Sequence, residues 1–240
     1  MMDLMNKKEK IVGILGGMGP LATIDVFSKI VKATPAKKDW EHLRIIIDNN
    51  PKIPSRTRAV VLGEQSPLPA MIETAKNLEN AGADLIIIPC NSAHYYIEDL
   101  KKSIHTPILN IIEITAKYLA ENLPNVRRIG LLGGLVTINM KIYEKELQKY
   151  AISVVVPETK DQELVSNVIE GIKLGKTKDN LVEDIEKVSK NLIAQGAQCI
   201  VLACTELAIL MDGKKTGVLF VDPNKVLAEE TVKIAKNIQG

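Results

Sequence analysis

The chain has 240 residues, of which 46% are hydrophobic, 25% are charged and only 3% are aromatic. This composition excludes disordered, collagen-like and coiled-coil proteins and predicts a globular chain with a core of Ile, Leu, Val and Ala. The 31 basic and 29 acidic residues give a net charge of +2 without a block of like charges, so we expect a small-molecule partner and no nucleic acid or membrane surface. At this length, one large domain or two lobes of about 100 residues can each bury a core.

The first residues imitate a secretion signal only in part. Residues 1–10 are charged and 11–15 are apolar, but the glycines and proline of 16–20 break the run, and no small-residue cleavage site follows. No stretch approaches the roughly 18 apolar residues of a membrane span. An odd number of cysteines without an export signal predicts free thiols and a cytoplasmic protein. The three cysteines are Cys90, Cys199 and Cys204.

Short apolar runs alternate with amphipathic stretches along the chain. The runs predict buried strands at 11–15, 43–47, 85–88, 108–111, 129–132, 154–156, 199–202 and 218–221. Helical patterns cover 71–81, 140–150, 164–174 and 181–195. Strands that alternate with helices predict parallel sheets with right-handed crossovers, and therefore an α/β fold.

The second half of the chain repeats the first. IVGILGG at 11–17 is answered by RIGLLGG at 128–134, and the apolar run that ends at Cys90 is answered by the run that ends at Cys204. Gly17 and Cys90 are 73 positions apart, whereas Gly134 and Cys204 are 70 apart. A third pair of strand-like segments follows each cysteine in the same order. Three matches in one order predict two related lobes that face each other.

Each repeated cysteine ends a predicted strand, at the sheet edge where parallel α/β proteins bind ligands. Asn91 and Ser92 follow Cys90, and Thr205 and Glu206 follow Cys204, so polar residues can start a helix at both places. Backbone N–H groups at a helix start stabilise a thiolate, and we therefore expect lowered cysteine pKa values. Cys199, inside an apolar run, is expected to be structural.

Two thiols on opposite faces of one carbon suit a stereoinversion. One thiolate removes the α-proton, and the other thiol returns a proton from behind the planar carbanion. A thiol pKa can be set near the working pH, which makes the group competent as base and as acid. The glycine turn and the polar residues after each cysteine can donate hydrogen bonds to the developing charge.

Five segments carry a resemblance to a known family. They are GGMGP at 16–20, IPSRT at 53–57, PCNSAH at 89–94, EGIK at 170–173 and ACTEL at 203–207. In this order and spacing the chain resembles the aspartate/glutamate racemase superfamily, most closely its cofactor-independent aspartate racemase branch.

The resemblance implies two similar α/β lobes related by a pseudo-two-fold axis, with the active site in the cleft between them. It implies that 1–113 together with 222–240 form an N-terminal lobe carrying Cys90, and that 114–221 form a C-terminal lobe carrying Cys204. It also implies a homodimer, an amino-acid substrate (aspartate first, then glutamate or a broader range), and neither pyridoxal phosphate nor metal.

Carried over residue by residue, the resemblance makes Cys90 and Cys204 the acid/base pair. The substrate-binding residues it implies are Gly17, Met18, Arg56, Asn91, Ser92, Thr137, Lys173 and Thr205. Thr137, in the second glycine turn, is the weaker candidate. One departure is Ser55, which stands where the aspartate racemase pattern usually has Asp.

Other functions stay open. The superfamily also isomerises or decarboxylates small dicarboxylic acids, and a two-lobed solute-binding module would need the cleft without the thiols. GMGPLA at 17–22 outlines a dinucleotide-binding turn, although Pro20 is unusual there. A zinc site from Cys90, His94 and Cys204 lacks a C-x-x-C pair, and His94 is expected to be structural rather than to polarise Cys90.

Overall fold

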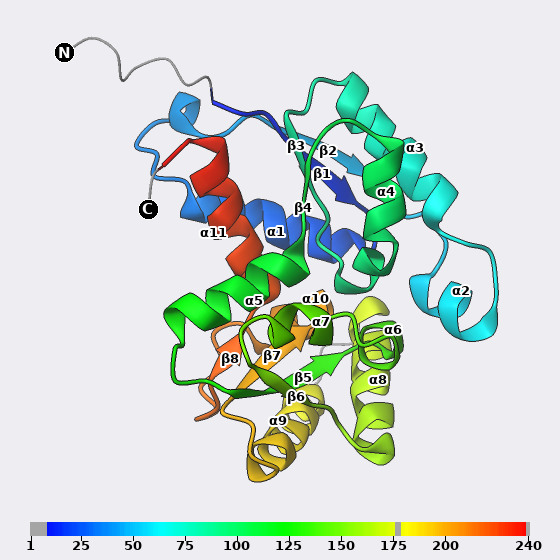
Figure 1. Ribbon diagram of the computed structural model, residues 1–240, viewed down its shortest axis with the longest axis vertical. Helices are drawn as coiled ribbons and strands as arrows, with labels where there is room; N and C mark the ends of the chain where they lie inside the picture. Colours follow the sequence, from blue (N-terminus) through cyan, green and yellow to red (C-terminus); the bar gives the residue numbers. More distant parts are fainter. Residues whose placement is uncertain (1–8, 176–178, 239–240) are drawn as a thin grey trace.

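The computed structural model describes residues 9–175 and 179–238, which form two parallel four-stranded sheets flanked by helices (Figure 1). The first sheet has the order β2-β1-β3-β4 and the second β6-β5-β7-β8, so the two topologies are the same. The strands are β1 (Val12–Gly16), β2 (Ile45–Asn49), β3 (Leu85–Ile87), β4 (Ile108–Leu109), β5 (Arg128–Gly133), β6 (Ser153–Val155), β7 (Cys199–Ala203) and β8 (Phe220–Val221). The predicted two-lobed α/β fold is confirmed.

The central strands are apolar because helices cover both faces of each sheet. Every residue of β1, β3 and β7 is buried, as a parallel sheet requires. The helices are α1 (Pro20–Ala33), α2 (Arg56–Leu62), α3 (Leu68–Asn80), α4 (Ile97–Ser103), α5 (Ile111–Asn122), α6 (Leu135–Asn139), α7 (Glu144–Gln148), α8 (Thr159–Lys173), α9 (Asp179–Ala194), α10 (Thr205–Met211) and α11 (Pro223–Ala235). Two short 3-10 helices are η1 (Asp39–Glu41) and η2 (Asn91–Tyr96).

The helix predicted at 140–150 is confirmed only over 144–148. The chain leaves α6 in a turn, in which Lys141 adopts the left-handed conformation with φ 49°, and α7 begins only at Glu144. Tyr143 ends this turn and is completely buried. An unbroken helix would place this side chain elsewhere, so burial of the aromatic ring prevails over the helical pattern.

The last strand of each sheet is shorter than predicted: β4 ends two residues early, before the capping residue Asn110, whereas β8 begins two residues late and ends at Val221 as predicted. The side chain of Asn110 accepts a hydrogen bond of 2.9 Å from the backbone N–H of Ile112 at the start of α5. After β8 of the second sheet, Asp222 accepts one of 2.9 Å from the N–H of Asn224 at the start of α11. The repeat therefore extends to the caps that start the helices after β4 and β8.

Helix α11 follows the last strand of the second sheet and lies beside α1 and α5 (Figure 1). Lys29 of α1 bridges two carboxylates there, at 2.5 Å from Asp25 and 2.6 Å from Asp222. Leu227 and Val232 of α11 belong to the same buried cluster as Ile30 of α1.

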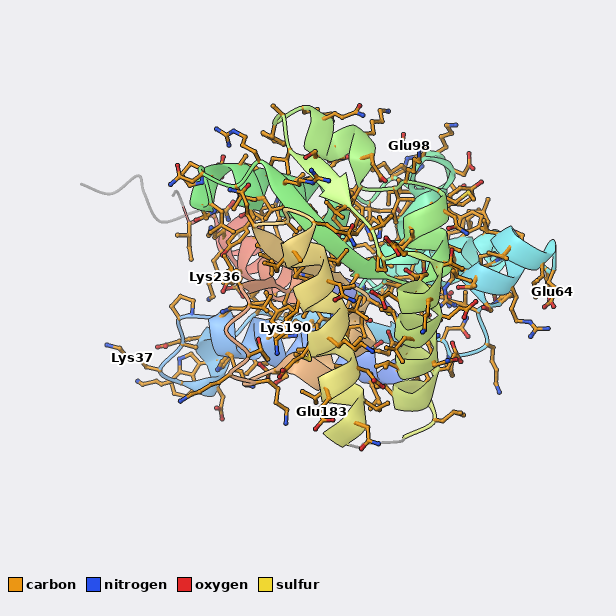
Figure 2. The ribbon with its side chains drawn as sticks, turned by 90° about the horizontal axis from the view of Figure 1, so that it is seen from below. Lys37, Glu64, Glu98, Glu183, Lys190 and Lys236 are labelled. Carbon is orange, nitrogen blue, oxygen red and sulfur yellow. The ribbon has the colours of Figure 1, made fainter. Side chains whose placement is uncertain are left out.

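Charged side chains of both signs lie at the periphery, where Lys37, Glu64 and Glu98 project away from the ribbon (Figure 2). Across 9–175 and 179–238, no helix combines the length and the apolar character that crossing a bilayer demands.

Candidate active site

Both repeated cysteines line one cavity of about 240 Å³ between the two sheets. Met18 reaches the cavity from the end of β1, and Cys90 reaches it from the end of β3. Leu135 after β5 and Cys204 after β7 occupy the equivalent places in the second sheet. The volume is below the roughly 300–1,000 Å³ of pockets for drug-sized ligands, and so suits a small molecule.

The environment of Cys90 is neutral. Its side chain is 6% exposed, and its Sγ lies 3.5 Å from the hydroxyl oxygen of Ser92. His94 does not contact the sulfur: its Nδ1 lies 2.9 Å from the Cys90 carbonyl oxygen, and its Nε2 accepts a bond of 3.3 Å from the N–H of Ile111. Burial lowers the pKa of His94 to about 4, so the ring is neutral and structural.

The environment of Cys204 is acidic. Its thiol donates a hydrogen bond of 3.0 Å to Oε2 of Glu206, and the hydroxyl of Thr205 donates one of 3.2 Å to the same oxygen. Burial raises the pKa of Cys204 well above its usual range, and the Glu206 carboxylate raises it further, against a smaller opposing effect of Lys173. The expected lowering of this pKa by the helix start is therefore wrong for Cys204, because desolvation and a neighbouring negative charge outweigh it.

The first glycine turn, which follows β1, forms part of the wall of the cavity. Gly17 has φ 90°, and a Cβ there would lie 2.3 Å from the backbone of Asn50, so no side chain fits. The N–H of Gly17 donates a bond of 2.9 Å to the hydroxyl of Thr23. Gly17 itself lines an adjoining cavity rather than the one between the cysteines, whereas Met18 lines both.

Arg56, the first residue of α2, is held at the cavity by backbone oxygens. Its guanidinium donates to the carbonyls of Pro54 at 3.1 Å and of Met18 at 3.2 Å. Its Nε is buried without a hydrogen-bond partner among the described residues. Ser55 caps α2, since its hydroxyl accepts a bond of 3.3 Å from the N–H of Arg58. The structural task of Ser55 is therefore one that the expected Asp could also perform.

Lys173 reaches the cavity from the end of α8, where it pairs with Glu170 at 2.8 Å. Burial disfavours its charge, but Glu170, Glu206 and Cys204 together raise its pKa. Ser166, Ile169 and Glu170 also line the cavity, and the sequence analysis missed them. Their spacing before Lys173 marks one face of a helix, which is the signal that could have found them.

The remaining predicted residues also meet at the cavity. Asn91, Ser92, Thr137 and Thr205 all line it, and Thr137 comes from α6. Asn91 accepts a hydrogen bond of 2.6 Å from the hydroxyl of Tyr143, a residue that the sequence analysis did not find because it lies where the predicted helix is not confirmed. The structure thus brings together every predicted site residue at this cavity except Gly17, which lines the adjoining cavity.

The donors do not suit a metal or a dinucleotide. Among residues 9–175 and 179–238, no group of three or more His, Cys, Asp and Glu could hold a metal ion, and both ring nitrogens of His94 face backbone groups. A Cβ on Gly19 would lie 3.7 Å from Oε1 of Glu206. A carboxylate beside this turn would repel the phosphates that a dinucleotide-binding turn receives.

Comparisons with known proteins agree on one family. Residues 15–231 match the family model described as Asp/Glu/Hydantoin racemase. The broad specificity amino-acid racemase RacX of Bacillus subtilis is 30% identical over 231 residues, which cover 92% of this chain and 96% of the relative.

Solved structures give the same result. Aspartate racemase from Picrophilus torridus superposes with a TM-score of 0.84 at 33% identity, covering 95% of this chain and 94% of that one. Glutamate racemase from Francisella tularensis, solved with D-glutamate, shares the fold with a TM-score of 0.65 at 19% identity, covering 96% of this chain and 81% of that one.

Proposed function

The chain belongs to the Asp/Glu/Hydantoin racemase family, and from this premise we propose that it is a cofactor-independent racemase of aspartate, with glutamate or a broader range of amino acids next. The observation that carries the proposal is the pair of thiols from equivalent strand ends in one small cavity. The sequence identity of 33% to an aspartate racemase and of 30% to a broad-specificity amino-acid racemase supports an amino acid as the substrate.

In the proposed mechanism, the thiols act as a base and an acid on opposite faces of Cα. For one enantiomer, Cys204 with its raised pKa is the thiol that donates a proton, and Cys90, as the thiolate, takes the α-proton. For the opposite enantiomer the roles are exchanged. Once Cys204 has lost its proton, it faces the carboxylate of Glu206, and this repulsion makes it a strong base that recovers a proton readily.

Hydrogen-bond donors at the cavity stabilise the carbanion. We assign Asn91 and Ser92, which line the cavity, as donors to the α-carboxylate, where each donor contributes about 3 kcal/mol in the transition state. Thr205 lines the same cavity, but its hydroxyl proton is donated to Glu206. Arg56 and Lys173 supply the positive charge that a side-chain carboxylate requires. We further propose a homodimer, as the resemblance implies, and a cytoplasmic location, which the three free cysteines support.

The reaction is tested with L-aspartate in deuterated water. Racemisation through Cα deprotonation predicts loss of optical rotation together with solvent deuterium at Cα, and no change in mass other than deuterium. A decarboxylase or a dicarboxylate isomerase would give a different product, and a binding module would give neither signal.

The residue assignment is tested by removing one thiol at a time. Cys90→Ala and Cys204→Ala should each lower racemisation by at least about 10²- to 10⁴-fold, since each variant lacks one of the two proton-transfer groups. Cys199→Ala is the matched control, because this thiol lies in the core within β7. Near-native turnover in either of the first two variants would show that the paired assignment is wrong.

The substrate is tested by a chirality screen of the proteinogenic amino acids. Aspartate and glutamate differ by one methylene, a difference that binding distinguishes by only about 1–3 kcal/mol. We expect aspartate to give the highest kcat/KM. A higher value for an uncharged amino acid would contradict the role assigned to Arg56 and Lys173.

A further inference from the structure

The hydrogen bond between Tyr143 and Asn91 joins the two halves of the molecule beside the cavity. The two residues are 52 positions apart in the chain, and their oxygen atoms lie 2.6 Å apart. Asn91 follows the first sheet's strand β3, whereas Tyr143 follows α6 in the second lobe. Asn91 is 3% exposed and Tyr143 is completely buried. Tyr143 does not line the cavity, whereas Asn91 does.

The bond leaves one end of the Asn91 amide without a partner. Its Oδ1 accepts the proton of Tyr143, but its Nδ2 is buried and makes no hydrogen bond within the described part of the chain. Buried polar groups are nearly always paired, so an unpaired amide nitrogen in a residue that lines a cavity points to a ligand that accepts hydrogen bonds. A carboxylate is such a ligand, because it only accepts.

Tyr143 donates this bond and Oδ1 of Asn91 accepts it, and the protonated state of the tyrosine is consistent with that direction. Burial raises the pKa of its hydroxyl far above the usual range, and the hydroxyl of Thr115 opposes this only partly. The tyrosine therefore keeps a proton to donate, and the amide oxygen is the group that accepts it. A half-turn of the amide would point Oδ1 at the cavity, where it would repel a carboxylate.

The break between α6 and α7 positions the hydroxyl of Tyr143. The left-handed Lys141 turns the chain sharply after α6, and Tyr143 comes directly before α7. Its ring joins the aliphatic cluster formed by both lobes. The packing of the ring thus holds the donor in place independently of the substrate.

We propose that Tyr143 is a positioning residue: it holds the Asn91 carboxamide with its nitrogen toward the cavity, ready to donate to the carboxylate of the substrate. The inference rests on the proposed racemase function. It adds a residue that lies outside the cavity and sets the orientation of one inside it.

The first test is Tyr143→Phe, which removes only the hydroxyl and keeps the ring. The amide can then turn, so kcat/KM should fall about 10- to 100-fold, mainly through a higher KM, as for a lost charged hydrogen bond. The fall should be equal for L- and D-aspartate, since the two enantiomers are equally stable. Tyr118→Phe is the control, because Tyr118 lies in the separate groove between α5 and α11. Unchanged kinetics in Tyr143→Phe would overturn the inference.

A double-mutant cycle separates positioning from general support of the fold. In an Asn91→Ala background no amide remains to be oriented, so adding Tyr143→Phe should change kcat/KM less than about twofold. Full additivity of the two losses would show that Tyr143 acts elsewhere, and would overturn the inference. If the wild-type protein does not exchange the α-proton, the proposed function is contradicted as well. If the wild type is active but the losses of the two single variants are additive, only the inference is contradicted.

Asn91→Asp provides a test in case Tyr143→Phe does not fold. The carboxylate keeps an acceptor for Tyr143 but presents oxygen instead of nitrogen to the cavity. It should therefore raise KM more than Asn91→Ala does. An equal or smaller effect of the aspartate would contradict the orientation proposed for the amide.

Discussion

The residues two positions after the cysteines make the two thiols unequal. Cys90 faces the hydroxyl of Ser92, whereas Cys204 donates to the carboxylate of Glu206. The repeat thus preserves the place of the sulfur and changes its charge environment. Cys204 therefore holds its proton more tightly than an ordinary thiol does.

Glu206→Gln should lower the pKa of Cys204, because it removes the negative charge that disfavours the thiolate. In a Cys90→Ala/Cys199→Ala background, the rate of alkylation by iodoacetamide should therefore reach its midpoint at a lower pH. The control is Glu170→Gln at the same cavity, whose carboxylate pairs with Lys173 instead. A midpoint that stays in place, or that rises, would contradict the assigned role of Glu206.

Among the elements, α2 shows how a short helix positions a charge. Its seven residues include none that is buried, so its ends decide its stability. The cap at Ser55 immediately precedes Arg56, which connects the cap to the cavity.

Ser55→Ala should loosen α2 by about 1 kcal/mol and raise the KM for aspartate several-fold, because Arg56 loses a fixed start of the helix. Ser55→Asp should keep the cap and the stability. Chemical denaturation and steady-state kinetics of both variants check this. Equal KM values for Ser55→Ala and the wild type would show that the cap at Ser55 does not affect the placement of Arg56.

The sequence predicted most of the elements that build the site, because buried parallel strands have strong local signals. The runs ending at Cys90 and Cys204 both form strands whose ends meet at the cavity. Tyr143 could not be predicted, since its position depends on a left-handed residue and on packing between the lobes. The charge state of Cys204 likewise follows from burial, which local sequence does not reveal.

At the scale of the whole molecule, Lys29 connects α1, near the beginning of the chain, with the start of α11 near its end. Its ammonium lies between Asp25 of α1 and Asp222, the cap of α11, and its side chain is 14% exposed. Lys29→Met would leave two carboxylates facing each other without a cation. The loss should be about 1.5–3 kcal/mol, measured as a lower Tm than that of Lys32→Met, an exposed change on the same helix.

The pH dependence has a defined sign. Burial disfavours the charge of Lys29, but Asp222 and Asp25 outweigh it and raise the pKa above 10.5. The group then stabilises the fold fully below pH 10.5 and ceases to do so as the pH rises through the folded-state value. The Tm difference between the wild type and Lys29→Met should therefore be constant near neutral pH and shrink above 10.5. A difference that grows in alkali would contradict the bridge.

The packing of α11 against α1 sets the order in which these two helices can assemble during translation. Val26 and Ile30 of α1 share a buried cluster with Leu227 and Val232 of α11, and more than 180 residues are made between the two helices. On the ribosome, we therefore expect the part of α1 that α11 covers to stay exposed until the segment 223–235 has emerged. The half that is synthesised first is completed late, so a nascent chain stalled before residue 223 exposes a surface that chaperones bind.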